Sequence, residues 1–284
     1  MKKIILATLI GAIALGTANA SPNDADQYGV RTSVFNPIYR PLQNDWALQA
    51  GFAFQTGAHQ GNGGQTDIAS GDFTVGDVKV AYGVMDNLYV SFDVYKDTFE
   101  INPYFSNFII GQFANPELGI NWQIFRPSKS FALDLIGKYG IAWTKDATTD
   151  QRIGMNNLQA GLHIYGDEGM FQWGVQSLAQ YAFTPEGMAG MWNLLSRAEA
   201  EFEIVDRVGL KGQFDYNVYN MNEGDSAPVI YDRVLALGVV WDVSPAVAAI
   251  QPYVSYHFQT ANSADSSTLP NNFWQIGAKF GIQF

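Results

Sequence analysis

From residue 45 onward, hydrophobic and polar residues alternate one by one in segment after segment. A period of two is typical of β-strands whose two faces meet different surroundings. In one segment, for example, Leu118, Ile120 and Trp122 fall on one face, whereas Asn121 and Gln123 fall on the other. The pattern predicts an all-β chain with twelve strands, near residues 45–56, 73–84, 88–99, 116–125, 131–143, 155–165, 170–183, 191–205, 207–220, 231–243, 249–260 and 272–284.

The connections between these segments are alternately short and long. Short connections are expected at residues 85–87, 126–130, 166–169, 206–207 and 244–248, and long ones near 57–72, 100–115, 144–154, 184–190, 221–230 and 261–271. Short turns at one end and long loops at the other predict an up-and-down antiparallel meander. Because segment ends read from sequence are uncertain by about 2–4 residues, ten or fourteen strands also fit the pattern.

Strand length and composition favour a membrane barrel over a soluble sandwich. The predicted strands run about 10–15 residues, whereas soluble strands average roughly 5–6 and membrane-crossing strands need about 9–11. Aromatic residues gather near the segment ends, where rings would lie at the level of the lipid headgroups. Only 15% of the residues are charged, against roughly 25% in an average soluble domain.

The N-terminus predicts export. Lys2 and Lys3 precede an apolar stretch at residues 4–15, and Ala18-Asn19-Ala20 forms a small-residue cleavage site. We expect residues 1–20 to be a secretory signal peptide. Removing the two lysines leaves 14 basic and 27 acidic residues, a net charge of −13, which argues against a nucleic-acid partner. The chain has no cysteine, which excludes disulfides, thiolate metal sites and a cysteine nucleophile.

The last predicted strand carries a family resemblance. It ends in Phe284, with Ile282 and Phe280 in step behind it, and it resembles the C-terminal strand of bacterial outer-membrane β-barrel proteins. The resemblance implies location in the outer membrane, contact with its lipids and lipopolysaccharide, and delivery by periplasmic chaperones. It also implies that Phe280, Ile282 and Phe284 are recognised by the barrel-assembly machinery, with both chain termini and the short turns on the periplasmic side. Residues 45–284 would then form the barrel, and residues 21–44 a periplasmic segment that either plugs the opening or lies outside it.

A barrel of twelve strands lies between the filled interior of about eight strands and the open channel of 16 to 18. We therefore expect a narrow, passive diffusion channel for small hydrophilic solutes, with a closed structural or adhesive barrel that acts through its loops as the alternative. The alternation of the two faces along each strand, which we call parity, assigns nine acids and five bases to the interior. This excess of acids predicts that the channel has a modest preference for cations. The other interpretation is that these charges pair across strands and brace the wall. The residues assigned to the pore are Asp77, Lys79, Asp93, Glu117, Asp134, Lys138, Arg197, Glu199, Glu201, Glu203, Lys211, Asp215, Asp232 and Lys279.

The second long loop, residues 100–115, is unexpectedly apolar. The pairs Tyr104–Phe108 and Phe105–Ile109 are four residues apart, which predicts a short helix. This helix could fold into the barrel mouth and constrict it, or rest on the rim as an apolar lid.

Catalysis is not expected. Ser255 and His257 share a strand face, but parity points them into the lumen, and the Ser-x-His order reverses the pattern of barrel phospholipases and lipid A deacylases. A lipid-modifying hydrolase is therefore the least favoured function. No phosphate-binding loop or metal-spaced histidine set occurs, so neither cofactor nor metal is expected.

Overall fold

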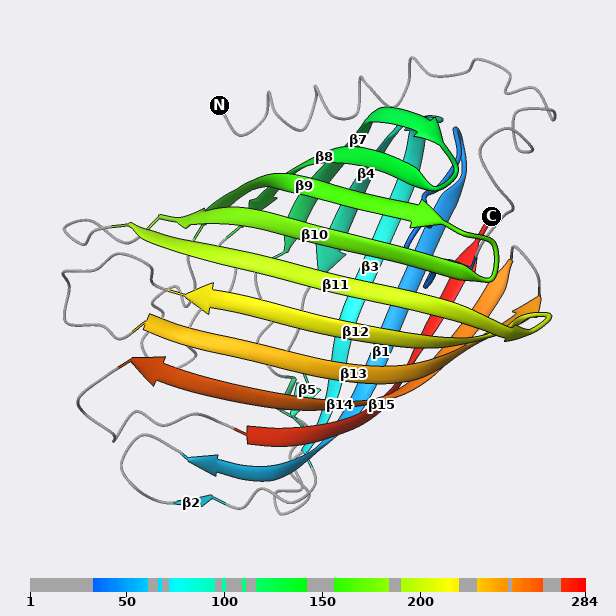
Figure 1. The fold of residues 1–284 in the computed structure, drawn as a ribbon. Helices are drawn as coiled ribbons and strands as arrows, with labels where there is room; N and C mark the ends of the chain where they lie inside the picture. The colour runs from blue at the N-terminus through cyan, green and yellow to red at the C-terminus, as the bar shows by residue number, and fades with distance from the viewer. Residues whose placement is uncertain are drawn as a thin grey trace.

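The structure is a computed structural model that describes residues 33–60, 66–67, 72–94, 99–100, 109–110, 116–141, 156–183, 190–219, 229–244, 247–262 and 272–284. Twelve antiparallel strands form a closed barrel (Figure 1). The strands are β1 (Trp46–Gln60), β3 (Asp72–Met85), β4 (Leu88–Val94), β7 (Glu117–Ser128), β8 (Phe131–Gly140), β9 (Asn157–Asp167), β10 (Phe171–Ala182), β11 (Met191–Val205), β12 (Val208–Tyr219), β13 (Val229–Ser244), β14 (Ala248–Asn262) and β15 (Asn272–Gln283). The predicted fold class is confirmed. Within the described part of the chain, no helix has the length and apolarity to cross a membrane.

The barrel closes because its first and last strands pair. The register runs from Ala47 opposite Gln283 to Ala58 opposite Asn272. Closure leaves no strand of the ring with an unpaired edge. In hydrocarbon, where water cannot satisfy backbone groups, a sheet is stable only in this closed form.

The two faces of the wall differ in chemistry. On β7, the side chains of Ile120 and Trp122 are about half exposed on the outside, at 48% and 49%. Asn121 and Gln123, which alternate with them, are 5% and 6% exposed on the inside. Further outward side chains of this kind are Leu135, Leu162, Phe202, Leu210, Leu237 and Ile276. An apolar surface that surrounds the whole barrel needs a lipid covering, because water would meet far more apolar area than soluble monomers expose.

Aromatic side chains mark the two rims of this apolar face. Trp46 packs against Tyr82 at one rim, and Tyr256 packs against Trp274 at the other, each with ring centroids 4.7 Å apart. The two rims are about ten residues apart along a strand. At a rise of about 3.4 Å per residue and a tilt of about 40°, this separation corresponds to about 26 Å across the membrane. It matches the apolar band of outer-membrane barrels, about 25 Å tall.

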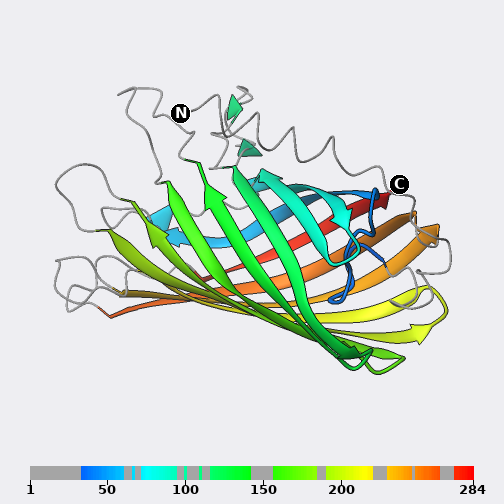
Figure 2. The same cartoon turned by 90° about the horizontal axis from the view of Figure 1, so that it is seen from above.

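All the short turns lie at one end of the barrel, together with the start of β1 and the end of β15. We call this the short-turn end, and the opposite end the long-loop end. The residues just before β1 turn back into the ring of strands at the short-turn end (Figure 2). We refer to residues 33–45 as the N-terminal segment.

The second long loop differs from its prediction. The strand expected to reach residue 99 is described as far as Val94, and Phe99–Glu100 form β5, with residues 95–98 outside the described ranges. This strand pairs with β6, Ile109–Ile110, so the helix predicted through Ile109 is wrong at that residue. The physical reason is that adjacent β-branched side chains favour an extended backbone. Tyr104, Phe105 and Phe108 lie outside the described residues, and their role as a constriction stays a prediction. The strands β2 (Thr66–Asp67), β5 and β6 are short additions at the long-loop end.

Candidate functional site: a lumen closed by the N-terminal segment

The N-terminal segment folds into consecutive turns. The backbone N–H of Asn36 donates to the carbonyl of Ser33 at 2.9 Å, and that of Tyr39 donates to the carbonyl of Asn36 at 3.0 Å. The side-chain oxygen of Asn36 accepts a further bond from the N–H of Ile38 at 3.1 Å. Asparagine favours such turns because its side chain mimics the backbone. The segment therefore satisfies part of its own backbone inside the barrel.

Two apolar side chains anchor the segment to the wall. Val34 and Phe35 are only 6% and 4% exposed. They pack in a cluster whose wall members are the small or branched residues Ala47, Ala81, Val240 and Ala249. The inner wall is therefore apolar around Val34 and Phe35, although the lumen is polar elsewhere.

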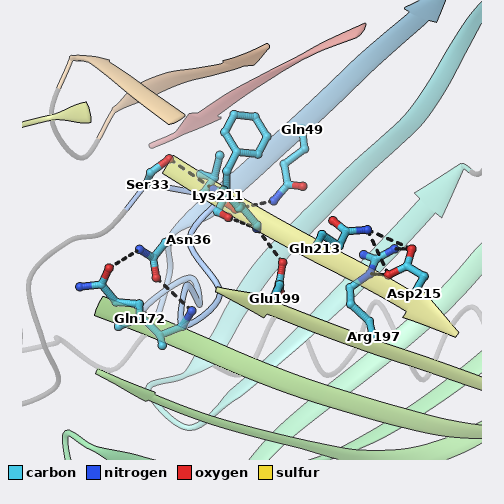
Figure 3. A network of polar contacts seen from close by, with 12 residues as sticks. Ser33, Asn36, Gln49, Gln172, Arg197, Glu199, Lys211, Gln213 and Asp215 are labelled. Atoms are coloured by element: carbon cyan, nitrogen blue, oxygen red, sulfur yellow. Dashed lines mark hydrogen bonds and ion pairs between the residues drawn. The ribbon is translucent and has the colours of Figure 1, made fainter. Parts of the chain in front are cut away.

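Polar contacts connect the segment to β1, β10 and β12 (Figure 3). The amide of Gln49 on β1 donates to the carbonyl of Val34 at 2.8 Å. The ammonium of Lys211 on β12 donates to the carbonyl of Phe35. The amide of Asn36 donates to Gln172 on β10 at 3.4 Å. These contacts come from separate sides of the ring, so the segment spans the lumen.

Arg40 is the charged anchor of the segment. One guanidinium nitrogen donates to the Tyr165 hydroxyl at 3.2 Å and lies 3.9 Å from Asp134. The Tyr165 hydroxyl donates to Asp134 at 3.1 Å and accepts from Gln123 at 2.5 Å. The side chains of Arg40 and Asp134 are 7% and 4% exposed. A buried charge needs a partner, so these two charges hold each other in place.

The segment passes so close to β3 that the wall has no room for a side chain there. A Cβ atom on Gly83 would lie 1.8 Å from the carbonyl oxygen of Leu42. The carbonyl of Gly83 accepts from the N–H of Asn44 at 2.8 Å, and its own N–H donates to the carbonyl of Asp45 at 3.0 Å. Glycine is therefore required at this close approach.

Tyr39 of the segment is half-buried and packs, like Tyr89 of β4, against the cluster around Val34 and Phe35. Its hydroxyl has no hydrogen-bond partner among the residues that the structure describes. Burial raises the pKa of Tyr39 above its ordinary value, because the phenolate loses more hydration than the phenol. The group therefore stays a neutral phenol at physiological pH.

The structure brings several of the sequence-predicted charges into pairs. Lys138 lies 3.4 Å from both Asp93 and Glu117. Arg197 makes a two-point contact with Asp215, at 2.8 and 3.0 Å.

The remaining assigned residues have varied surroundings. Glu199 lies 2.6 Å from the ammonium of Lys211. Glu201 is buried beside Asn36 and Lys211, and Asp232 accepts from Asn217 at 3.4 Å. Lys279 lies over the ring of Tyr253. Lys79 faces the cavity that is described in the next paragraph. Glu203 is partly buried near the short turn after β11. The side chain of Asp77 is outside the described part of the structure. Asp134 was assigned to the lumen, but its partner Arg40 was not anticipated.

A cavity of about 160 Å³ lies directly above the segment. Residues 34–37, Tyr39 and Pro41 line it on the side of the segment. Its walls carry the polar side chains of Gln49, Lys79, His163, Gln176, Arg197, Glu199, Lys211, Gln213, Gln251 and Lys279.

The histidine of the Ser255–His257 pair also contacts a third side chain. Its Nε2 atom lies 3.3 Å from the Ser255 hydroxyl and 3.1 Å from the side-chain amide oxygen of Gln275. As an acceptor for the serine proton it could not donate to Gln275, and as a donor to Gln275 it could not act as the base. No metal-binding group of three or more His, Cys, Asp or Glu occurs in the described ranges.

The chain matches no protein-family model and no curated protein. Among solved structures, it resembles an outer membrane channel from Pseudomonas putida F1, with 7% identity, a TM-score of 0.58, and coverage of 90% of this chain and 100% of that one. Weaker likenesses are the CymD monoaromatic hydrocarbon channel (10% identity, 86% and 89% coverage, TM-score 0.46) and the KdgM porin in complex with oligogalacturonate (8% identity, 82% and 98% coverage, TM-score 0.46). At such identities the likeness shows the fold alone. Together with the apolar band between two aromatic rims, it identifies an outer-membrane β-barrel.

Proposed function

We propose that this chain is a narrow passive channel for small hydrophilic solutes, held closed at its short-turn end by the N-terminal segment. The observation that carries the proposal is the contrast between an apolar outer wall and a polar lumen occupied by a non-covalently held segment. In line with the family resemblance, we propose that the short-turn end faces the periplasm and that residues 21–44 form a plug. The outward-facing side chains of Phe280, Ile282 and Phe284 remain our proposed signal for the barrel-assembly machinery.

The proposal is tested by swelling of liposomes that contain the purified chain. We expect slow entry of a pentose such as arabinose, because the segment leaves only brief openings, and no entry of a trisaccharide such as raffinose, because twelve strands enclose a narrow lumen. Equal rates for the two sugars would contradict a narrow channel.

The filled short-turn end also favours a second candidate function, a closed structural or adhesive barrel that acts through its loops. The two functions differ in what happens when the segment is removed. A channel gains sugar entry, whereas a structural barrel stays impermeable because no through-path exists above the segment.

We propose that the fourteen residues assigned by parity line the pore, and that its preference for cations is small. The acid excess remains, but much of it is offset, because Lys138, Arg197 and Lys211 each neutralise an acid. In a salt gradient across a planar bilayer, the reversal potential should deviate only slightly from zero, in the direction of cation selectivity. A strong preference for anions would contradict an acid-lined pore.

A further inference from the structure

The cavity above the N-terminal segment has the opposite charge to the chain as a whole. Its lining includes four cations, Lys79, Arg197, Lys211 and Lys279, and one acid, Glu199. With His163 neutral, four positive charges minus one negative charge give +3. Asp215 and Glu201 lie outside the lining but next to Arg197 and Lys211, and counting both leaves +1.

These cations approach the cavity from different sides of the barrel. In the ring order, β3 and β11 are six strands apart among twelve, so Lys79 lies across the lumen from Arg197. Lys211 on β12 and Lys279 on β15 approach from strands between these two walls. A ligand in the cavity would therefore meet positive charge on several sides, as a solvated surface patch could not provide.

Neutral groups take part in the described contacts of two of these cations. Lys211 is 8% exposed and shares its ammonium between Glu199 and the carbonyl of Phe35. Lys279 lies 5.4 Å from the ring centroid of Tyr253. Cations held away from bulk water attract a counter-charge strongly, because the local dielectric constant is low.

We propose that this cavity binds a small oxyanion, a carboxylate or a phosphate, between Lys79, Lys211 and Lys279. At about 30 Å³ per water molecule, the cavity has room for about five waters, which limits the ligand to a small metabolite-sized anion. The amides of Gln176 and Gln251 on its wall can donate further hydrogen bonds to the ligand oxygens. The proposed site rests on the proposed channel function, to which it adds a class of solute. Binding of an anion in the cavity can nevertheless be measured whether or not the barrel conducts.

Isothermal titration calorimetry of the full chain in a neutral detergent at low ionic strength tests the site. The probes are succinate and inorganic phosphate, with butane-1,4-diol and 1,4-diaminobutane as the uncharged and cationic counterparts of succinate. We expect saturable binding of at least one anion at one site per chain, weakened by added salt, and no binding of the diol or the diamine. The two anion arms show whether a carboxylate or a phosphate is preferred.

Three variants test whether the anion detected by calorimetry binds in the cavity. Lys79→Gln should weaken anion binding about tenfold, since a hydrogen bond to a charged group contributes about 1.5 kcal/mol. Glu199→Gln should strengthen it, because it removes the one acid of the lining. Lys129→Gln is the matched control, an exposed lysine in the short turn between β7 and β8 that is absent from the cavity lining, and it should leave anion binding unchanged.

No anion binding to the unmodified chain would overturn the site. So would binding that is the same in the Lys79→Gln and Lys129→Gln variants. Liposome swelling, measured separately, reports on conduction, so failure of the anion site and failure of the channel are distinguishable.

Discussion

Removing residues 21–43 from the chain, with the export signal kept, is expected to raise the single-channel conductance in planar bilayers several-fold. The segment now fills the lumen through Val34, Phe35 and Arg40, which contact the wall on different sides. The barrel strands do not depend on the segment for their pairing, because the ring is closed by the β1–β15 ladder. Deletion should therefore open the short-turn end without unfolding the wall.

The matched control is Tyr39→Phe, which removes a hydroxyl that bonds to no described residue and should leave the conductance unchanged.

A point variant in the wall should also open the short-turn end. Gly83→Val introduces a side chain where the carbonyl of Leu42 now lies, and it should displace the segment and increase the conductance. If the shortened chain folds but conducts no better than the full chain, the segment is not what closes the lumen.

Linking the segment covalently to the wall should make the conductance depend on redox conditions. A Cβ atom on Gly281 would lie 2.0 Å from a methyl carbon of Val34, so the two Cβ positions are at most about 3.5 Å apart, close to the range of disulfides. We expect the double variant Val34→Cys with Gly281→Cys to form this bond on oxidation. The oxidised channel should lose the brief openings of the full chain, and a reducing agent should restore them within one recording.

The chain has no native cysteine, so each single cysteine variant is a clean control that should not respond to oxidant. Equal open probability in the oxidised and reduced double variant, with the bond verified by mass spectrometry, would show that the segment does not move when the channel opens.

The barrel was predictable because its signal is local and repeated. Each strand repeats the alternation seen in Ile120, Asn121 and Trp122, and membrane barrels require it of every strand. Short turns such as Asp206–Arg207 then determine the order of pairing. The predicted boundaries of β11, residues 191–205, agree with the structure.

The arrangement inside the lumen was not predictable in the same way. Arg40 reaches Tyr165 across 125 residues of chain, and Asn36 reaches Gln172 across 136. No spacing rule connects such residues. From the sequence alone, residues 21–44 were expected either to plug the opening or to lie outside it, and nothing indicated where they pack. Parity placed the charges on a face, but only the three-dimensional structure shows which ones share a cavity.

The contact between Val34 and Gly281 has a consequence for how the barrel is made. Gly281 belongs to the last strand, and Gln49, which bonds the carbonyl of Val34, belongs to the first. These strands are neighbours only after the seam has formed. The binding surface for the segment is therefore complete only when the β1–β15 seam has formed, so we expect the segment to dock as the barrel closes and not before.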